Sequence, residues 1–222
     1  MTTYSLHRAW LPSDDGGRVH DDVLVEVADG RFTRVEAGVE VGVAGGTRLP
    51  GLTLPGFANA HGHAFHRALR GRTQRGRGTF WTWREQMYGV AGRLTPDLYR
   101  ELAAAAYREM VAAGWTSVGE FHYLHHQPGG TPYDDPNEMG HVLVEAARRA
   151  GIRITLLDTL YLSAGFGEPP AGVQVRYSDG SAERWAARVA ELDLAGQAMA
   201  GAAVHSVRAV PADELWAAAP YV

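Results

Sequence analysis

The chain has 222 residues, of which 45% are apolar and 21% are charged, a composition typical of globular proteins and not of disordered or fibrous ones. Its 21 basic residues, all of them Arg, against 25 acidic residues give a net charge of −4, which argues against sequence-independent binding to nucleic acid. The absence of Cys and Lys excludes disulfides, Cys-built zinc sites, Schiff-base lysines and lysine bridges between metals, and leaves ten His as metal ligands and proton carriers.

No segment has the pattern of a membrane or targeting sequence. Residues 1–20 lack the apolar core of a signal peptide. No apolar run approaches the ~20 residues that a membrane-spanning helix needs. We therefore expect a cytoplasmic protein with neither a membrane nor a nucleic acid as its partner.

Residues 1–52 carry the patterns of β-structure. Polar and apolar side chains alternate over residues 22–28, which is typical of a strand with one buried face. Asp29-Gly30 is a signal for a tight hairpin turn, so residues 31–35 are predicted as the return strand.

From residue 53 onward, apolar strands alternate with amphipathic helices. Four strands are predicted at residues 53–60, 116–122, 152–160 and 201–205, and helices at 96–113, 136–150, 181–192 and 211–219. The first of these helices has the clearest boundaries, with Thr95 as its cap, Pro96 at the first helical position and Gly114 at its end. The alternation predicts an α/β fold in which a parallel sheet is covered by helices.

His61 and His63 follow the first of these strands. Side chains two residues apart on a strand point the same way, so both imidazoles are expected to face the carboxyl end of the sheet, where α/β enzymes place their active sites. Neutral imidazoles bind Zn or Fe, and two of them form half of a chelate. The alternative is that the His-x-His spacing arose by chance in a chain with ten His.

Two further polar clusters lie at strand ends. Residues 120–126 (EFHYLHH) follow the second strand and either supply one or two functional side chains or form a loop of satisfied polar groups. After the fourth strand, His205 can polarise a substrate and Arg208 can hold a carboxylate through two parallel hydrogen bonds. The alternative for Arg208 is a surface ion pair.

Aromatic and basic residues fill the segment between the first strand and the first helix. Trp81 and Trp83 cannot share one helix face, so either one of them lines a pocket or both pack in the core. Five Arg precede them, at positions 67, 70, 72, 75 and 77. These Arg either attract an anionic ligand to the mouth of the sheet or form a solvated loop.

Five stretches together resemble the amidohydrolase superfamily, and within it the N-formimidoylglutamate deiminases of histidine degradation. They are GFANAHGHAFHRAL (56–69), FWTWREQMY (80–88), GWTSVGEFHYLHH (114–126), AGFGEPP (164–170) and VHSVRAVP (204–211). The resemblance implies the N-terminal half of a (β/α)8 metal-dependent hydrolase barrel, with its first four or so βα units at 53–222. It also implies a small β-sandwich segment at 1–52 before the barrel.

The same resemblance implies a mononuclear zinc site, with Fe as the alternative metal, in which His61 and His63 are two of the ligands. The match assigns substrate binding to His66, Arg84, Tyr123, His205 and Arg208. Among them, Arg84, Tyr123 and Arg208 would hold the carboxylates of a small diacid, and His205 would contact the formimino group. The family usually has Gln where this chain has His66. The implied reaction is hydrolytic deimination of N-formimino-L-glutamate to N-formyl-L-glutamate and ammonia by zinc-activated water.

The length limits what the chain is expected to do by itself. A complete barrel takes ~250 residues, so residues 53–222 hold about half of one. The family's third His ligand, catalytic Glu and final Asp ligand belong to later strands, so no catalytic general base is identified here. The chain is then the N-terminal portion of a zinc deiminase, for which the resemblance also suggests a homodimer, or an inactive or unstable fragment. A third hypothesis is that the protein belongs to the same enzyme class but acts on another amidine, a guanidine or a nucleobase.

Overall fold

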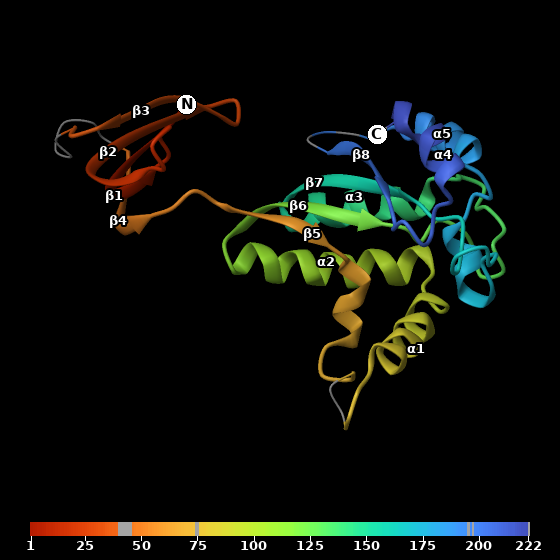
Figure 1. The fold of residues 1–222 in the computed structure, drawn as a ribbon. Helices are drawn as coiled ribbons and strands as arrows, with labels where there is room; N and C mark the ends of the chain where they lie inside the picture. Colours follow the sequence, from red (N-terminus) through yellow and green to blue (C-terminus); the bar gives the residue numbers. More distant parts are fainter. Residues whose placement is uncertain (40–45, 74–75, 195, 197, 222) are drawn as a thin grey trace. The chain divides into compact units, whose positions relative to one another are not determined.

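The computed structural model describes residues 1–39, 46–73, 76–194, 196 and 198–221. The chain divides into two compact units, Met1–Gly56 and Phe57–Val222, whose elements are labelled in Figure 1. The division falls at Gly56, whereas the sequence pattern placed it after residue 52.

The first unit contains one four-stranded sheet. Its strands are β1 (Thr2–Leu11), β2 (Arg18–Ala28), β3 (Arg31–Ala37) and β4 (Thr47–Thr53), in the order β3-β2-β1-β4. β1 and β4 run parallel, whereas β2 runs antiparallel to both of its neighbours. The described residues of this unit therefore form a single sheet in place of the two facing sheets that the term sandwich implies.

The hairpin between β2 and β3 is formed as the sequence predicted. Asp29 and Gly30 both have positive φ, 51° and 73°, the conformation that a two-residue turn between twisted strands requires. One face of the sheet carries a small apolar cluster, formed by Leu6, Ala9, Val23 and Val25.

The second unit is built on a parallel sheet, which confirms the predicted fold class. Strands β5 (Phe57–Gly62), β6 (Trp115–His122), β7 (Arg153–Leu160) and β8 (Met199–Val204) lie in sequence order, and all neighbours are parallel. The first strand was predicted at 53–60. The observed β5 runs from Phe57 to Gly62. It begins after Pro55 because proline has no N–H to donate to a neighbouring strand.

The helices of this unit mostly begin and end at their predicted signals. They are α2 (Pro96–Ala112), α3 (Glu138–Ala150), α4 (Ala182–Ala190) and α5 (Ala212–Ala218). The Thr95 hydroxyl accepts a hydrogen bond from the Leu98 N–H at 3.3 Å and so caps α2. Gly151, with φ of 77°, ends α3.

Four helical elements were not predicted. They are α1 (Phe80–Ala91) and three 3-10 helices, η1 (Ala64–Leu69), η2 (Gly172–Tyr177) and η3 (Ala219–Tyr221). Thr79 and Thr82 cap the start of α1 reciprocally, because each side chain accepts a hydrogen bond from the other residue's backbone N–H. A Thr three residues from another Thr is a weaker start signal than the Ser/Thr-x-x-Glu pattern, and aromatic residues favour helix less than Ala or Leu do.

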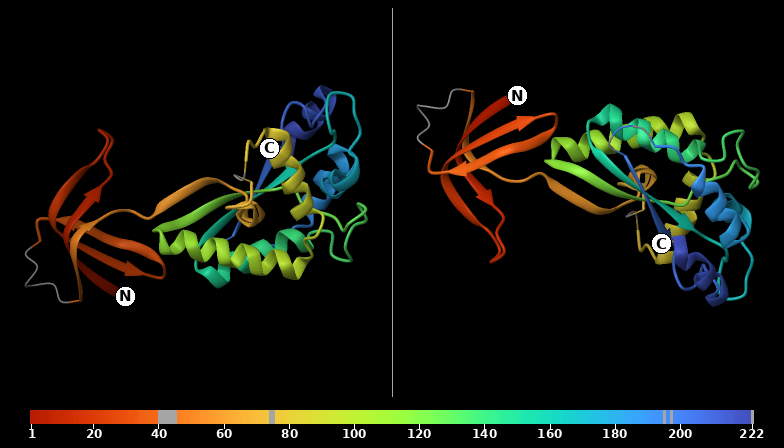
Figure 2. Two further views of the ribbon diagram at one scale, coloured as in Figure 1. Left: turned by 90° about the horizontal axis from the view of Figure 1, so that it is seen from below. Right: turned by 90° about the horizontal axis from the view of Figure 1, so that it is seen from above.

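The largest core lies between the parallel sheet and the paired helices α2 and α3 (Figures 1 and 2). Its fully buried side chains include Tyr99 and Tyr107 of α2, Met139 and Leu143 of α3, and Leu156 of β7. This packing holds the four strands in place. It therefore also positions the residues that directly follow the carboxyl end of each strand. Among the described residues, no helix combines the length and the apolarity that crossing a membrane requires.

Candidate active site

A cavity of about 440 Å³ opens at the carboxyl ends of the four parallel strands. The residue directly after each strand lines it: His63 after β5, Tyr123 after β6, Tyr161 after β7 and His205 after β8. The other lining residues are His61, His66, Phe80, Trp81, Trp83, Arg84, Met87, Tyr88, Phe121, Tyr177 and Arg208. All seven site residues suggested by the sequence therefore lie around one cavity.

His61 and His63 point their Nε2 atoms at one another, 2.9 Å apart. The Nδ1 of His63 lies 3.2 Å from the Phe121 carbonyl oxygen, to which it can only donate. In the neutral ring, this places the proton on Nδ1 and leaves the Nε2 lone pair directed at His61. A backbone carbonyl that orients a ring in this way is a common partner of metal-binding His.

The spacing of this pair and the charge state of His63 fit a metal ion. Two nitrogens at 2.0–2.1 Å from a tetrahedral zinc are about 3.3 Å apart, so the observed separation needs to widen by only a few tenths of an ångström. Burial and the neighbouring His61 lower the pKa of His63 to about 4, partly opposed by the Phe121 carbonyl. The ring is therefore neutral at pH 7, as a metal ligand must be.

Two side chains, those of Asn59 and Glu120, form hydrogen bonds with the backbone of the turn that carries this pair. The Asn59 side chain accepts a hydrogen bond from the His61 N–H at 3.1 Å. The Glu120 carboxyl group, which is fully buried, accepts one from the Ala64 N–H at 2.6 Å. Burial raises the pKa of Glu120 to about 7, and the hydrogen bond from Ala64 works in the opposite direction.

His66 and Tyr123 lie next to the pair. The His66 ring stacks on His63, with ring centres 4.6 Å apart, and its Nε2 lies 3.0 Å from the Tyr123 hydroxyl. Burial and the nearby His63 lower the pKa of His66 to about 3, so this ring is also neutral. Either group can thus donate to the other, or turn its donor toward a bound molecule.

Arg84 and Arg208 bring positive charge to the cavity. Arg84 donates from Nε to the Tyr88 hydroxyl at 2.8 Å, and Arg208 donates to the Ala164 carbonyl. Neither forms an ion pair with an acidic group of the described residues, and no Asp or Glu lines the cavity. Two guanidinium groups without a carboxylate partner make this cavity suited to an anionic ligand.

The aromatic residues of α1 form one wall of the cavity. Trp81 is 64% exposed, and it lines the cavity together with Trp83, so the reading in which both pack in the core is wrong. Sequence reasoning missed Tyr88 because it did not predict α1 as a helix. It also missed Tyr161, although the position directly after the third strand was an available signal.

The Arg-rich segment before α1 does not reach the cavity. Arg67 donates two hydrogen bonds of 2.7 Å to Glu109, and Arg70 lies 3.9 Å from the same carboxylate. Arg72 and Arg77 are exposed, and Arg75 lies outside the described residues. None of the described Arg in this segment lines the cavity. Of the two predictions for this segment, these Arg therefore follow the solvated loop and not the anion-attracting site.

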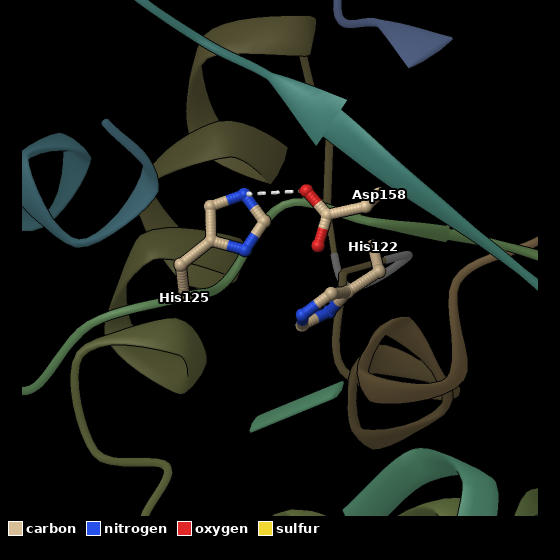
Figure 3. Close-up of side chains that lie close together, drawn as sticks. All are labelled: His122, His125 and Asp158. Atoms are coloured by element: carbon tan, nitrogen blue, oxygen red, sulfur yellow. Dashed lines mark ion pairs between the residues drawn. The ribbon is translucent and has the colours of Figure 1, made fainter. Parts of the chain in front are cut away.

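A second His-containing group combines side chains from β6, β7 and the loop that follows β6 (Figure 3). His122, His125 and Asp158 are all buried and place one ligand atom each within 4.8 Å of one another. Nε2 of His125 lies 3.8 Å from Asp158 and 3.1 Å from the Thr159 carbonyl, to which it donates. Sequence reasoning noted both His but did not connect them with Asp158.

The Asp158 carboxylate already has protein partners. One oxygen accepts hydrogen bonds from Arg188 at 2.8 Å and from the Trp185 indole N–H at 2.9 Å. The other accepts from Arg188 at 2.9 Å. A metal ion there would compete with a buried guanidinium for the same carboxylate, so this group fits a metal less well than the His61/His63 pair does.

Residues 52–219 match the model of the amidohydrolase family. The chain belongs to the amidohydrolase family. It is 38% identical to formimidoylglutamate deiminase from Pseudomonas aeruginosa over 97% of its own length and 48% of that protein. Over a shorter stretch, 36% of the chain, this amidohydrolase is 30% identical to 8-oxoguanine deaminase from the same organism.

Solved structures agree with the family assignment. An amidohydrolase from Brucella melitensis matches with a TM-score of 0.84 and 35% identity, over 98% of this chain and 49% of that one. Atrazine chlorohydrolase from Arthrobacter aurescens, solved with zinc, matches with a TM-score of 0.76 and 20% identity, over 100% and 51%. The chain thus spans about half the length of the deiminase and of these solved structures.

Proposed function

We propose that the protein containing this amidohydrolase chain is a zinc-dependent deiminase that converts N-formimino-L-glutamate and water into N-formyl-L-glutamate and ammonia. The observation that carries the proposal is the composition of one cavity: a His pair at chelating distance faces two guanidinium groups, and no described acidic residue lines the space between them. The 38% identity to formimidoylglutamate deiminase supports the same substrate.

In this proposal, His61 and His63 would hold zinc together with ligands from outside the described residues. A zinc ion bound there would lower the pKa of a water molecule to about 7 and so supply a nucleophile at neutral pH. The atrazine chlorohydrolase solved with zinc supports this metal, and Fe remains the alternative because imidazole binds both.

The other lining residues would bind and orient the substrate. Arg84, Tyr123 and Arg208 would hold its two carboxylates, because guanidinium groups bind carboxylates through paired, charge-assisted hydrogen bonds. His205 would face the formimino group. Burial and the charge of Arg208 lower the pKa of His205 to about 4, so its ring is neutral and can both donate and accept a hydrogen bond.

The reaction balances without an oxidant or a second substrate. The formimino carbon gains an oxygen from water, its bond to the terminal nitrogen breaks, and that nitrogen leaves as ammonia. Water supplies two of the three hydrogens of ammonia, and the third is already on the imino nitrogen. We assign no residue of this chain as the general base.

A nucleobase deaminase is the second candidate, favoured by the local similarity to 8-oxoguanine deaminase. A nucleobase has no carboxylate, so it would leave the charges of Arg84 and Arg208 without a partner in the cavity. This mismatch favours the diacid. The inactive fragment remains the alternative for the 222-residue chain taken alone.

The proposal is tested by measuring zinc content and ammonia release with N-formimino-L-glutamate and, separately, 8-oxoguanine. The 222-residue chain should be compared with the longer product if the reading frame continues. We expect one zinc per chain and ammonia from the diacid in the protein that contains a full barrel. Turnover by the 222-residue chain would exclude the inactive fragment, and no ammonia from the diacid with either protein would overturn the substrate assignment.

Replacing Arg208 by Ala should raise KM for N-formimino-L-glutamate in the active protein. The loss of a charge-assisted hydrogen bond is worth about 1.5–3 kcal/mol, or roughly a 10- to 100-fold increase. Steady-state assays of ammonia release would measure the change in KM. Arg72→Ala, which replaces an exposed Arg in the segment before α1, is the control. An unchanged KM in Arg208→Ala would remove Arg208 from the carboxylate site.

A further inference from the structure

The turn from His61 to Ala64 rests on a buried carboxyl group of the neighbouring strand. Gly62 at the end of β5 is in register with Glu120 of β6, whose side chain is 0% exposed. One oxygen of Glu120 accepts the Ala64 N–H at 2.6 Å. Hydrogen bonds that involve an ionisable carboxyl group at such short distances are stronger than those between neutral groups.

Gly62 shows how closely this turn approaches Glu120. A Cβ atom at position 62 would lie 2.9 Å from the second carboxyl oxygen of Glu120 and 2.9 Å from a methyl group of Val118. Any other residue at position 62 would force either the turn or these two side chains to shift. The second oxygen has no hydrogen-bond partner among the described residues, and Glu120 is absent from the lining of the cavity.

Two consecutive residues of β6 therefore position His63, one through its ring and the other through the backbone next to it. The Phe121 carbonyl oxygen accepts from the His63 ring, and the Glu120 side chain accepts from the backbone N–H of the next residue, Ala64. The first contact sets the orientation of the ring, and the second fixes the backbone that carries it.

We propose that Glu120 is a positioning residue that holds His61 and His63 at chelating distance by anchoring the Ala64 amide. The inference rests on the proposed function for the identity of the metal site. Glu120 does not touch the substrate space, so it acts through the turn and takes no part in proton transfer at the reacting atoms. Residues that support metal ligands in this way typically change metal affinity 10–100-fold when they are replaced.

The test compares Glu120→Ala with Glu120→Gln in the longer protein that contains the full barrel, because the 222-residue chain supplies only two of the proposed zinc ligands. Gln keeps an oxygen that can accept the Ala64 N–H, whereas Ala removes it. We expect Glu120→Ala to bind zinc about 10–100-fold more weakly, in competition with a chromogenic zinc chelator, and Glu120→Gln to stay close to wild type. Glu101→Ala, an exposed acidic position on α2, is the control.

Hydrogen exchange of the Ala64 amide in metal-free protein provides a second readout. We expect faster exchange in Glu120→Ala and near-normal exchange in Glu120→Gln, while exchange in the α3 core stays unchanged. If Glu120→Ala does not fold, Glu120→Asp, whose side chain is one methylene shorter, should show the same weakening in a milder form.

The outcomes separate this inference from the proposed function. A wild-type full-barrel protein that binds no zinc would contradict the proposed metal centre, and exchange at Ala64 would still decide the role of Glu120. Unchanged zinc affinity together with unchanged Ala64 exchange in Glu120→Ala would overturn the positioning role. Equal loss of zinc affinity in the Ala and Gln variants would overturn it too, because only the Ala variant removes the acceptor.

Discussion

Replacing His61 and His63 together by Ala is expected to abolish zinc binding at the mouth of the sheet. The two Nε2 atoms, 2.9 Å apart, are the closest pair of metal-binding atoms around the cavity, and a zinc site that loses two imidazoles loses half of its four ligands. Zinc content after dialysis should fall from one equivalent to none, and ammonia release by the active protein should fall with it.

The matched control is His141→Ala. His141 lies on α3, where its Nδ1 is hydrogen-bonded to Asp135 at 2.7 Å, and it does not line the cavity. Its replacement should leave one equivalent of zinc bound. Retention of a full equivalent by the double variant would show that the metal binds elsewhere.

Replacing Arg188 by Met is expected to have the largest effect on folding stability. Arg188 is buried on α4, and all five of its N–H groups donate at 2.8–3.1 Å to Asp158, Asp179 and the Asn137 side-chain oxygen. Its removal leaves two buried carboxylates without their counter-charge. Breaking a buried charge network in this way costs about 3–5 kcal/mol of unfolding free energy.

Urea unfolding at pH 7 would measure this loss. Arg184→Met, an exposed Arg of the same helix, is the control and should change the unfolding free energy by less than about 0.5 kcal/mol. A loss below about 1 kcal/mol for Arg188→Met would mean that the buried network contributes little to stability, as some buried ion pairs do.

The same network predicts a pH dependence. Burial opposes ionisation of Asp158, but the adjacent His125 and Arg188 hold its pKa well below the usual range, and His126 and Arg188 do the same for Asp179. Carboxyl groups with a lowered pKa in the folded state stabilise it above their unfolded pKa of about 4, and that contribution is lost as the pH falls further. The difference between wild type and Arg188→Met should therefore shrink below about pH 4.

The parallel part of the fold could be predicted because its signals are local and agree with one another. The Thr95-Pro96 start of α2 and the Gly151 end of α3 are both present in the structure. Helix α1 was missed because its aromatic residues do not share one buried face: Phe80 and Trp81 are exposed, whereas Trp83 and Tyr88 pack against the core. They therefore produce no simple apolar repeat.

The candidate site could be located from the sequence to the extent that it depends on strand ends. His61, His63, Tyr123 and His205 lie together because parallel strands deliver the residues at their carboxyl ends to one edge. The role of Glu120 depends on contacts across strands at the scale of a single hydrogen bond, which strand assignment does not resolve. The link between Asp158 and Arg188 joins residues 30 positions apart on different elements, and no local pattern encodes it.

The position of bound zinc is the most direct test of the proposed metal centre, because the chain holds two groups of His-containing ligands. Anomalous diffraction at the zinc absorption edge, from crystals of the zinc-loaded protein, would place the metal. We expect a single strong peak about 2 Å from the Nε2 atoms of His61 and His63. A peak among His122, His125 and Asp158, with none at the His61/His63 pair, would contradict it.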